Sequence, residues 1–507
     1  MLKSLFLESN SLENKKKFIV VIDQGTTSTR AILFNSSGDP VFKSQLEFKQ
    51  YFPKNGWVEH NPEEIWNKTK RVLIDVVDKS RKLKGEISTI GITNQRETTI
   101  LWDKFSGKPV YNAIVWQDRR TADFCKKFKS NKRENLINRK TGLLIDPYFS
   151  GTKIKWIIDN VPKAKILLRK KQLLFGTIDT FLLWRLTRGK IHATDATNAS
   201  RTMLYNINTN KWDKKILKIL KIPSHILPSI KNSSDNFGET HRSITKKSYP
   251  ITGVVGDQQA ATIGQCCFEK GAVKSTYGTG AFMMINTGAK KIYSKNKLLT
   301  TICYRLNEKN TYALEGSIFI AGAGVQWLRD KIRLIKKSSD TEKIAKSLKS
   351  NSGVYLVPAF TGLGSPYWDS KARGVISGIT RDTGYKEIVR ATIESVAYQS
   401  YDLLKAMHND GIKLKVIKID GGMVKNNWFS QFLSDVINIK VDRSKVDETS
   451  ALGAAFMAGL KVGIFKSLKD ISKYWRSDRR FNPKIKTRER KKILKGWSRA
   501  IKKTLIH

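Results

Sequence analysis

The sequence predicts an α/β protein built from two related domains. Its 507 residues exceed what one hydrophobic core usually organises, so two large domains are expected. Short apolar runs suited to buried strands alternate with amphipathic stretches suited to helices, which is the pattern of an α/β fold. A strand–turn–strand plan at residues 19–38 returns at 272–288, which indicates a duplication. We therefore divide the chain into an N-terminal extension (1–17), a first domain (18–265) and a second domain (266–507).

The composition narrows the class of protein. Apolar residues make up 40% of the chain and twelve residues are Trp, which is ample for two packed cores and excludes a disordered chain. The formal charge of +49 is compatible with nucleic acid or an anionic membrane as a partner. However, Lys and Arg are spread along almost the whole length. This spread favours solvated basic surfaces with weak, salt-sensitive polyanion binding and no specific nucleic-acid site.

The cysteines and the N-terminal residues predict a cytoplasmic protein. The four cysteines have neither the paired spacing of a disulfide framework nor a CxxC metal pattern, so we expect reduced, mostly buried thiols. Residues 1–17 lack the order of a secretory signal. No uncharged stretch is long enough to cross a bilayer, so membrane insertion is not expected.

The first strand and turn of the first domain form a candidate phosphate site. Residues 18–22 are apolar and mostly β-branched, and the run ends in Asp23 at the expected strand tip. Gly25 permits a tight turn, and Thr26, Thr27 and Ser28 then offer hydroxyls beside backbone N–H groups. Such a turn can cradle phosphate oxygens, while Asp23 can hold the Mg²⁺ that accompanies a nucleotide. Taken alone, the segment fits a hydrophilic hairpin loop equally well.

Two polar clusters follow later in the first domain. After a helix that we expect to begin at the Asn61 cap, the apolar residues 90–92 lead into the polar run 93–99, which contains Arg96 and Glu97. Residues 113–120 repeat this arrangement and contain Trp116. Viewed alone, the first cluster fits an exposed sheet edge with an Arg–Glu pair. Two such clusters favour a functional site.

Three further segments of the first domain are also candidates. Residues 146–153 predict a turn that feeds a helix, with Tyr148 as a pocket wall. Residues 195–201 predict a polar loop, for which a simple hydrogen-bonded turn is the structural alternative. Asp257 follows the apolar run 251–255 at a strand-to-helix junction, beside the positive end of the helix. A helix cap is the structural alternative for Asp257, and the two roles are compatible.

The second domain repeats the plan of the first, with Gly278-Thr279 in the place of Gly25-Thr26. A strand at 416–420 runs into Gly421-Gly422, where the backbone can be approached closely by a flat ring or a phosphate.

Three helices are expected in this second half. The segment 316–327 is expected to form the beginning of one helix, and another at 451–460 is lined with Ala and Gly for close packing. The last forty residues are basic with one apolar stripe, which predicts a docked terminal helix.

Together these features describe ATP·Mg²⁺ held in a cleft between two facing domains. Phosphoryl transfer needs in-line positioning and neutralisation of charge more than covalent chemistry from the protein. A carboxylate within reach of a substrate hydroxyl can accept its proton. Asp257 is our candidate for this base, and Asp23 is our candidate for the metal.

The motif series resembles that of the FGGY carbohydrate kinases, and among them the enzymes that phosphorylate glycerol. The similarity covers about residue 18 to residue 500 in the family's order, through the segments 23–30, 94–99, 146–153, 256–259, 277–282, 358–368 and 420–427. It implies the actin and hexokinase type of fold, in which two ribonuclease H-like ATPase domains flank a central cleft and close over substrate. It also implies transfer of the ATP γ-phosphoryl group to the primary hydroxyl of glycerol, giving sn-glycerol 3-phosphate and ADP.

The resemblance also implies a set of site residues. The expected glycerol contacts are Arg96, Glu97, Trp116, Tyr148, Asp257, Gln258 and Phe282, with Asp257 as the general base. Charged and amide groups suit the hydroxyls of a triol, and aromatic rings suit its C–H face. The expected nucleotide contacts are Thr26, Thr27, Ser28, Arg30, Thr279, Gly322, Gln326, Gly422 and Asn426. The expected Mg²⁺ carboxylates are Asp23 and Asp257.

Regulation is expected to differ from that of bacterial relatives, although a homodimer or homotetramer is implied as in the family. Relatives controlled by fructose 1,6-bisphosphate have a Gly-rich loop where this chain has residues 240–249, and no glycine stands there. Glu489 matches a residue that contacts the phosphotransferase IIA protein, but its neighbours are more basic. We therefore do not expect either control in its usual form.

Two other functions stay open at this point. One keeps the reaction and changes the substrate to another polyol or to a pentulose, which greater turnover of a sugar would reveal. The other is a basic protein that has lost its enzymatic role and holds nucleic acid, which tight binding at physiological salt would reveal.

Overall fold

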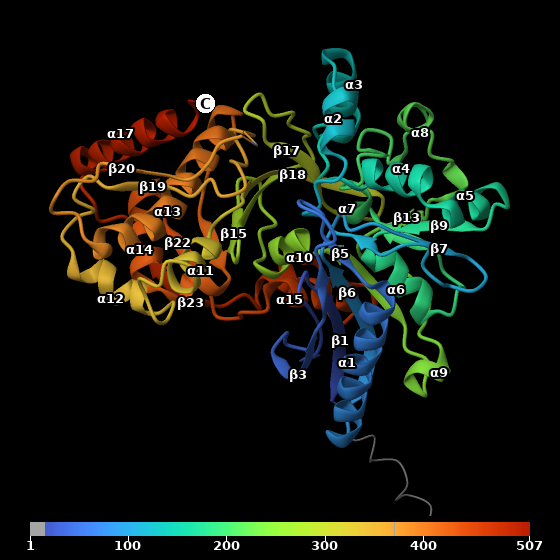
Figure 1. Ribbon diagram of the computed structural model, residues 1–507. Helices are drawn as coiled ribbons and strands as arrows, with labels where there is room; N and C mark the ends of the chain where they lie inside the picture. Colours follow the sequence, from blue (N-terminus) through green and yellow to red (C-terminus); the bar gives the residue numbers. More distant parts are fainter. Residues whose placement is uncertain (1–15, 370, 507) are drawn as a thin grey trace, which may run out of the picture.

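The computed structural model describes residues 16–369 and 371–506, so most of the predicted N-terminal extension lies outside the described residues. Two large mixed sheets organise this part of the chain, one in each half of the sequence. Figure 1 shows the first half, in blue and green, beside and below the second half, in yellow, orange and red.

The first sheet has the strand order β14-β6-β1-β2-β3. β1, β2 and β3 form the predicted antiparallel meander, and β6 and β14 lie parallel to β1 on its other side. The apolar run of β1 is fully buried in the middle of this sheet. The strands are β1 (Lys17–Gln24), β2 (Ser28–Asn35), β3 (Pro40–Glu47), β6 (Glu86–Asn94) and β14 (Ile251–Gly256).

Helix α1 (Pro62–Lys82) covers one face of the first sheet. Asn61 Oδ1 accepts hydrogen bonds from the backbone N–H groups of Glu63 and Glu64, and Pro62 occupies the first turn, where its missing N–H costs nothing. The apolar positions at helical spacing, including Val72 and Val76, face the sheet and are fully buried. The predicted cap and helix are therefore confirmed.

A second layer of small sheets and helices in the first half surrounds the carboxyl end of the first sheet. Its strands are β4 (Gln50–Tyr51), β5 (Glu59–His60), β7 (Ile100–Asp103), β8 (Ala113–Ile114), β9 (Leu173–Gly176), β10 (Ala193–Asp195), β11 (Tyr205–Asn206), β12 (Lys211–Trp212) and β13 (Ser229–Lys231). Its helices are α2 (Ala122–Phe128), α3 (Asn131–Thr141), α4 (Ser150–Asn160), α5 (Pro162–Arg169), α6 (Ile178–Leu186), α7 (Ala196–Ala199), α8 (Lys214–Leu220) and α9 (Arg242–Thr245).

The second sheet has the strand order β17-β18-β16-β15-β21-β22-β23. Its strands are β15 (Val273–Tyr277), β16 (Ala281–Gly288), β17 (Leu299–Leu306), β18 (Lys309–Ile318), β21 (Ile417–Asp420), β22 (Val441–Ser444) and β23 (Ser477–Phe481), with the separate pair β19 (Tyr355–Val357) and β20 (Val375–Ser377). The helices of this half are α11 (Gly322–Asp330), α12 (Asp340–Ser347), α13 (Tyr385–Asn409), α14 (Asn427–Ile437), α15 (Thr449–Lys461), α16 (Leu468–Ser472) and α17 (Thr487–Thr504).

The two sheets repeat one topology. In the first, β1 pairs antiparallel with β2 and parallel with β6; in the second, β15 pairs antiparallel with β16 and parallel with β21. The prediction of two related α/β domains is confirmed. The boundary near residue 265 stays a prediction, with β14 in the first sheet and β15 in the second.

Helices α10 (Asp257–Gly264) and α15 join the two halves in the centre of the molecule (Figure 1). They pack backbone to backbone, because a Cβ atom built on Gly453 would lie 1.8 Å from the carbonyl oxygen of Ala260. α15 also covers the face of the first sheet opposite α1. It approaches the sheet closely there because Gly91 and Gly253 have no side chains. The predicted close-packing role of this Ala- and Gly-lined helix is therefore confirmed.

Three local expectations are wrong. Strand β18 continues to Ile318, so the helix after it begins at Gly322 and not near Gly316. Residues 195–201 are not a loop, because Asp195 caps the short buried helix α7. The polar run 93–99 is fully buried, so the alternative of an exposed edge fails for it.

The C-terminal helix α17 is docked, as predicted. Trp497 and Ile501 are buried in the core of the second half, and the Trp497 indole N–H donates to the Asp402 carboxylate at 2.7 Å. The basic residues of this helix lie mostly on its exposed side. In the described part of the chain, no helix combines the length and the apolar character that crossing a bilayer needs.

Candidate active site

The site lies where parallel strands of the first sheet end. β6 leads into the polar run 93–99 and the neighbouring β14 leads into Asp257, with Gly256 opposite Asn94 in the register. Carboxyl ends of adjacent parallel strands meet at the same edge of a sheet, so the two predicted segments lie together. Asp257 is the first residue of α10, and Gly256 holds the cap position. The capping alternative for Asp257 is therefore wrong.

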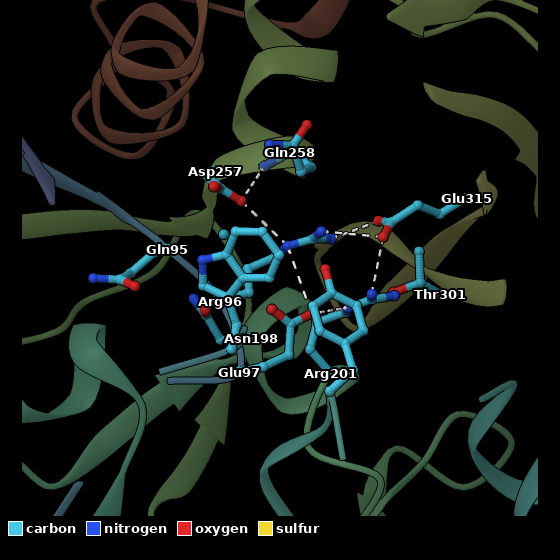
Figure 2. A network of polar contacts seen from close by, with 12 residues as sticks. Gln95, Arg96, Glu97, Asn198, Arg201, Asp257, Gln258, Thr301 and Glu315 are labelled. Atoms are coloured by element: carbon cyan, nitrogen blue, oxygen red, sulfur yellow. Dashed lines mark hydrogen bonds and ion pairs between the residues drawn. The ribbon is translucent and has the colours of Figure 1, made fainter. Parts of the chain in front are cut away.

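Arg96 is the centre of the polar cluster, which Figure 2 shows from close by. Its guanidinium pairs with Glu315 through two hydrogen bonds, at 2.6 and 3.1 Å, and donates to Gln259 Oε1 at 3.0 Å. Its Nε lies 3.2 Å from Asp257 Oδ1. Arg96 is buried, whereas the Asp257 side chain keeps 30% of its surface exposed and is the part of this pair that a ligand can reach.

Arg201 forms the second arginine of the cluster. Its Nε donates to Glu97 Oε1 at 2.6 Å and its Nη2 donates to Glu315 Oε1 at 2.9 Å. Glu315 therefore accepts from two arginines of the first half while it lies on β18 of the second half. Both halves of the chain contribute to one buried network.

Sequence reasoning missed Arg201 and Glu315. Arg201 was named only as the end of a polar loop, and Glu315 was not singled out. A signal was present, because Glu315 is the one carboxylate in the buried stretch 312–318 of β18, and a charge there needs a partner.

Burial and opposing charges set the ionisation of the cluster. Burial raises the pKa of Glu97 and that of Asp257 above their ordinary values, although Arg96 lowers both. Burial would also raise the pKa of Glu315, but Arg201 and Arg96 together lower it to about 2. Glu315 is thus the fixed counter-ion, while Asp257 holds its charge less firmly.

The backbone at Glu97 is held in an uncommon conformation. Its φ is +59°, in the left-handed region, and the N–H of Thr98 donates to the carbonyl of Arg96 at 2.7 Å. Ser150 Oγ donates to the Glu97 carbonyl at 3.0 Å, and Lys153 Nζ donates to the Tyr148 carbonyl at 2.7 Å. A strained residue held from several sides is typical of functional sites.

Trp116 joins the aromatic residues to the first turn. Its ring centroid lies 5.8 Å from that of Tyr148 and 5.9 Å from that of Phe282, edge to face in both cases. Its indole N–H donates to Thr26 Oγ1 at 3.0 Å. One side chain thus contacts the first turn, the predicted pocket wall and the strand after the second turn.

The first turn presents a carboxylate and hydroxyls as predicted. Asp23 is buried at the tip of β1, and its Oδ2 accepts from Arg30 Nε at 2.9 Å. Arg30 Nη1 in turn donates to Glu448 Oε2, of the second half, at 2.7 Å. Thr27 is exposed, and Gln45 Nε2 donates to Ser28 Oγ at 3.2 Å.

The second turn is fastened to the start of α11. The N–H of Gly322 donates to the Gly278 carbonyl at 2.9 Å, and the N–H of Ala321 donates to the Thr279 carbonyl at 2.9 Å. The side chains of Thr279 and Gln326 remain exposed. These backbone hydrogen bonds hold the second turn and the start of α11 in a fixed position relative to each other.

The glycine pair after β21 leaves backbone open for a ligand. Gly421 has a φ of +97°, and a Cβ atom there would lie 2.4 Å from the Tyr277 carbonyl oxygen, so only glycine fits. Gly422 faces open space, with no atom within 4 Å of a Cβ built on it. The side-chain amide of Asn426 has a protein partner at each end, because its Oδ1 accepts from Phe429 N and its Nδ2 donates to Thr341 Oγ1.

The two predicted metal carboxylates lie close enough to interact. Asp23 contributes to the raised pKa of Asp257, after the larger effect of burial. Within residues 16–369 and 371–506, no group of three or more His, Cys, Asp or Glu side chains could hold a metal ion. Protein carboxylates here suit a cation whose other ligands are phosphate oxygens and water.

Comparisons with known proteins find relatives that match most of the chain. The N-terminal domain of the FGGY family of carbohydrate kinases matches residues 18–264, and the C-terminal domain of that family matches residues 273–462. The chain is 53% identical to a glycerol kinase of Ectopseudomonas mendocina, over 96% of this chain and 99% of that protein. It is 54% identical to a glycerol kinase of Petrotoga mobilis, over 96% and 98% of the two chains.

Solved structures give the same result. The crystal structure of Plasmodium falciparum glycerol kinase with ADP superposes with a TM-score of 0.92 at 42% identity, over 97% of this chain and 99% of that one. A gluconate kinase from Lactobacillus acidophilus superposes with a TM-score of 0.86 at 23% identity, over 96% and 97% of the two chains, which reflects the shared fold alone.

Proposed function

Because this chain belongs to the FGGY family of carbohydrate kinases, we propose that it transfers the γ-phosphoryl group of ATP to the primary hydroxyl of glycerol. The products are sn-glycerol 3-phosphate and ADP. The observation that carries the proposal is the partly exposed Asp257 carboxylate, held 3.2 Å from Arg96 at one end of the polar cluster.

The polar cluster and the aromatic rings suit a small triol. Arg96 and the Gln258 amide donate hydrogen bonds, and Glu97 and Asp257 accept them, so each hydroxyl can find a partner. Trp116 and Phe282 supply apolar surface for the carbon chain. Trp116 also contacts the ring of Tyr148, so the three aromatic side chains form one wall.

Asp257 is the proposed general base. Its pKa is raised above the ordinary value by burial and by Asp23, which brings it closer to the pH at which the enzyme works. Arg96 keeps the carboxylate in place, because Arg96 is itself fixed by Glu315 and Gln259. A proton leaving the primary hydroxyl would pass to the carboxylate oxygen as the new oxygen–phosphorus bond forms.

ATP is proposed to lie between the two turns. Thr26, Thr27, Ser28 and Arg30 of the first turn and Thr279 of the second are its proposed phosphate contacts, since hydroxyls, backbone N–H groups and a guanidinium can donate hydrogen bonds to phosphate oxygens. Gly322, Gln326, Gly422 and Asn426 are proposed for the nucleoside end. Gly422 supports this best, because its backbone faces open space. Asn426 would act mainly by capping α14 beneath the nucleotide.

Mg²⁺ is proposed as the companion of the triphosphate. Asp23 and Asp257 would hold it together with phosphate oxygens and water, and it would neutralise charge on the phosphoryl group. Arg30 contacts only one oxygen of Asp23, which leaves the other available.

The proposal extends to assembly and location. A homodimer or homotetramer and a cytoplasmic location stay predictions from the family resemblance. The four cysteines support the latter, because all are free and three are buried.

An ADP-release assay over a panel of polyols and pentuloses tests the reaction. We expect glycerol to be the best substrate, and Asp257→Asn to lower kcat about 10²- to 10⁴-fold, because the amide cannot accept the proton. Glu269→Gln is the matched control, since this carboxylate is exposed and pairs only with Lys415 among the residues that the structure describes. Absence of glycerol turnover, or full activity in Asp257→Asn, would refute the proposal. A sugar turned over more efficiently would reassign the substrate.

A further inference from the structure

A buried lysine of the second half reaches the alcohol site of the first half. Lys274 lies on β15, next to Met284 of β16 and Lys418 of β21 in the register, and it is fully buried. Its Nζ donates to Gln258 Oε1 at 2.5 Å. An ammonium group in a protein interior is costly unless it is paired and hydrogen-bonded, so this contact needs an explanation.

The charges around Lys274 come from several elements. Asp257 at the start of α10, Asp420 at the end of β21, Glu315 on β18 and Arg96 after β6 all act on it electrostatically. Burial lowers the pKa of Lys274, and Asp420 and Asp257 oppose that effect. Asp420 is itself held by Gln265 Nε2 and Thr449 Oγ1, each at 2.8 Å. Lys274 therefore connects the alcohol site with the tip of the second sheet.

The chemistry of the contact fixes which way the Gln258 amide points. Lysine can only donate, so the amide atom that faces Lys274 must be the oxygen. The NH₂ group of Gln258 is then directed away from Lys274. A side-chain amide without fixed partners can rotate and interchange the positions of its oxygen and its NH₂ group. The contact with Lys274 prevents this rotation at Gln258.

From this geometry we propose that Lys274 is a positioning residue for the reaction, which holds the Gln258 amide so that its NH₂ group donates to a hydroxyl of the alcohol. The inference rests on the proposed function, because Gln258 is one of its glycerol contacts. Lys274 does not touch the alcohol itself. By fixing the amide, Lys274 makes the Gln258 NH₂ group the donor in this contact with the alcohol. The alcohol must then place a hydroxyl oxygen there, because an aliphatic hydrogen in its place would leave the NH₂ group without a partner.

The consequence is a role in substrate discrimination. A site that hydrogen-bonds a hydroxyl rejects an analogue that lacks it, because buried polar groups are left unpaired. If the Gln258 amide loses its fixed orientation, that penalty shrinks. Lys274→Met should therefore reduce the preference for glycerol over one of its deoxy analogues, in addition to any loss of rate.

The experiment compares three alcohols in three variants of the full chain. The alcohols are glycerol, propane-1,2-diol and propane-1,3-diol, and the variants are Lys274→Met, Lys274→Arg and Lys418→Met. Lys418 is a close control, because it stands beside Lys274 in the register but donates to the Gln265 carbonyl at 2.7 Å instead. The readouts are kcat and KM for each alcohol, with thermal melting to verify folding.

We expect Lys274→Met to lower the ratio of kcat/KM values, glycerol over the affected diol, at least about tenfold. Lys274→Arg should restore part of that ratio, and Lys418→Met should leave it within about twofold of the unaltered protein. An unchanged ratio in Lys274→Met would overturn the inference, even if the overall rate fell. Absence of glycerol turnover in the unaltered protein would overturn the proposed function and this inference together.

A second variant covers the case in which Lys274→Met does not fold. Gln258→Met removes the amide and keeps Lys274, and it should lose the same preference for glycerol. If Gln258→Met keeps the full preference, the amide does not read a hydroxyl and Lys274 has no such role.

Discussion

Glu315 is the residue on which both arginines of the first half converge. It accepts three hydrogen bonds from Arg96 and Arg201, and its side chain is almost fully buried. Removing one partner from a buried ion cluster is strongly destabilising, because the remaining charges lose their compensation. This residue therefore matters for folding as well as for the orientation of Arg96 beside Asp257.

We expect Glu315→Gln to lower the free energy of unfolding by about 3 kcal/mol. The amide still accepts hydrogen bonds but no longer balances two guanidinium charges. Denaturant unfolding at neutral pH measures the loss, and Glu308→Gln is the control, since that carboxylate is mostly exposed. A loss equal to that of the control would contradict this account.

The same pair of proteins gives a pH test. The pKa of Glu315 is lowered to about 2 in the folded protein from an ordinary value of 4.5. A lowered pKa means that the ionised group stabilises the fold fully above 4.5, and that this contribution is lost as the pH falls towards 2. The difference in stability between the unaltered protein and Glu315→Gln should therefore narrow as the pH is lowered through this range.

Individual site residues were predictable where they follow a strand. Asp23, Arg96, Glu97 and Asp257 stand just after apolar runs, so their place at the end of a sheet could be derived from the pattern. Arg201 and Glu315 could not be derived in the same way. Their partners lie 104 and more positions away in the chain, and only the packing of the two halves brings them together.

At the level of helices and strands, α10 and α15 bring the backbones of the two halves into close contact. Gly264 faces the Thr449 carbonyl and Gly453 faces the Ala260 carbonyl, so each glycine admits the backbone of the other helix. Asp257 starts the first of these helices and Glu448 precedes the second. The helix pair therefore fixes the distance between Asp257, the proposed base, and the second half.

We expect Gly453→Ala to destabilise the protein by about 3 kcal/mol or more, because the new methyl group has no room beside the Ala260 carbonyl. Helix propensity alone would predict the opposite sign, since Ala is the better helix former. Thermal unfolding decides between these two effects. Ser450→Ala, on the same helix and only half-buried, should shift the melting temperature little.

The sequence predicted helices better than it predicted their first residues. Asn61 with Pro62 marks α1 unambiguously, because a cap and a first-turn proline coincide. The start of α11 was placed too early, because the segment 316–327 was expected to form the beginning of a helix although Gly316 still lies inside β18. A Cβ at Gly316 would meet the Leu403 side chain at 2.7 Å, so this glycine serves packing and not a turn.

Across the whole molecule, Glu448 connects the halves beside the first turn, where we propose that ATP binds. It accepts from Arg30 at 2.7 Å and from Lys43 at 2.9 Å, and Arg30 also holds Asp23. These ion pairs are partly exposed, so their contribution to stability is small. We expect them instead to hold the Arg30 side chain in position in the first turn.

We expect Glu448→Gln to raise the KM for ATP severalfold while it changes kcat at saturating ATP by less than about twofold. The physical reason is that Arg30 loses the charge that holds its outer nitrogen. Lys43→Met is the matched control, because it removes the other partner of Glu448 and leaves Arg30 in place. Equal effects of both variants on the KM for ATP would show that Arg30 is not the link.

The two-domain α/β architecture could be predicted because the strand–turn–strand plan recurs in the sequence. The packing of α15 against the first sheet could not be predicted. Neither hydrophobic pattern nor turn chemistry shows that α15, near the end of the chain, covers the sheet that begins at Lys17. That contact depends on the small residues of α15 meeting Gly91 and Gly253, which are far away in sequence.

The position of α15 also determines when the chain can finish folding during its synthesis. Until the ribosome has released residues beyond 461, the side chains of Ile19, Val21, Ile32 and Phe34 have no cover on that face. The nascent first half therefore carries an apolar surface for most of translation, and such surfaces are where chaperones bind and aggregation begins. Cutting the chain at the boundary between its sheets would yield a fragment with this face bare, so the first half depends on the second for its folding.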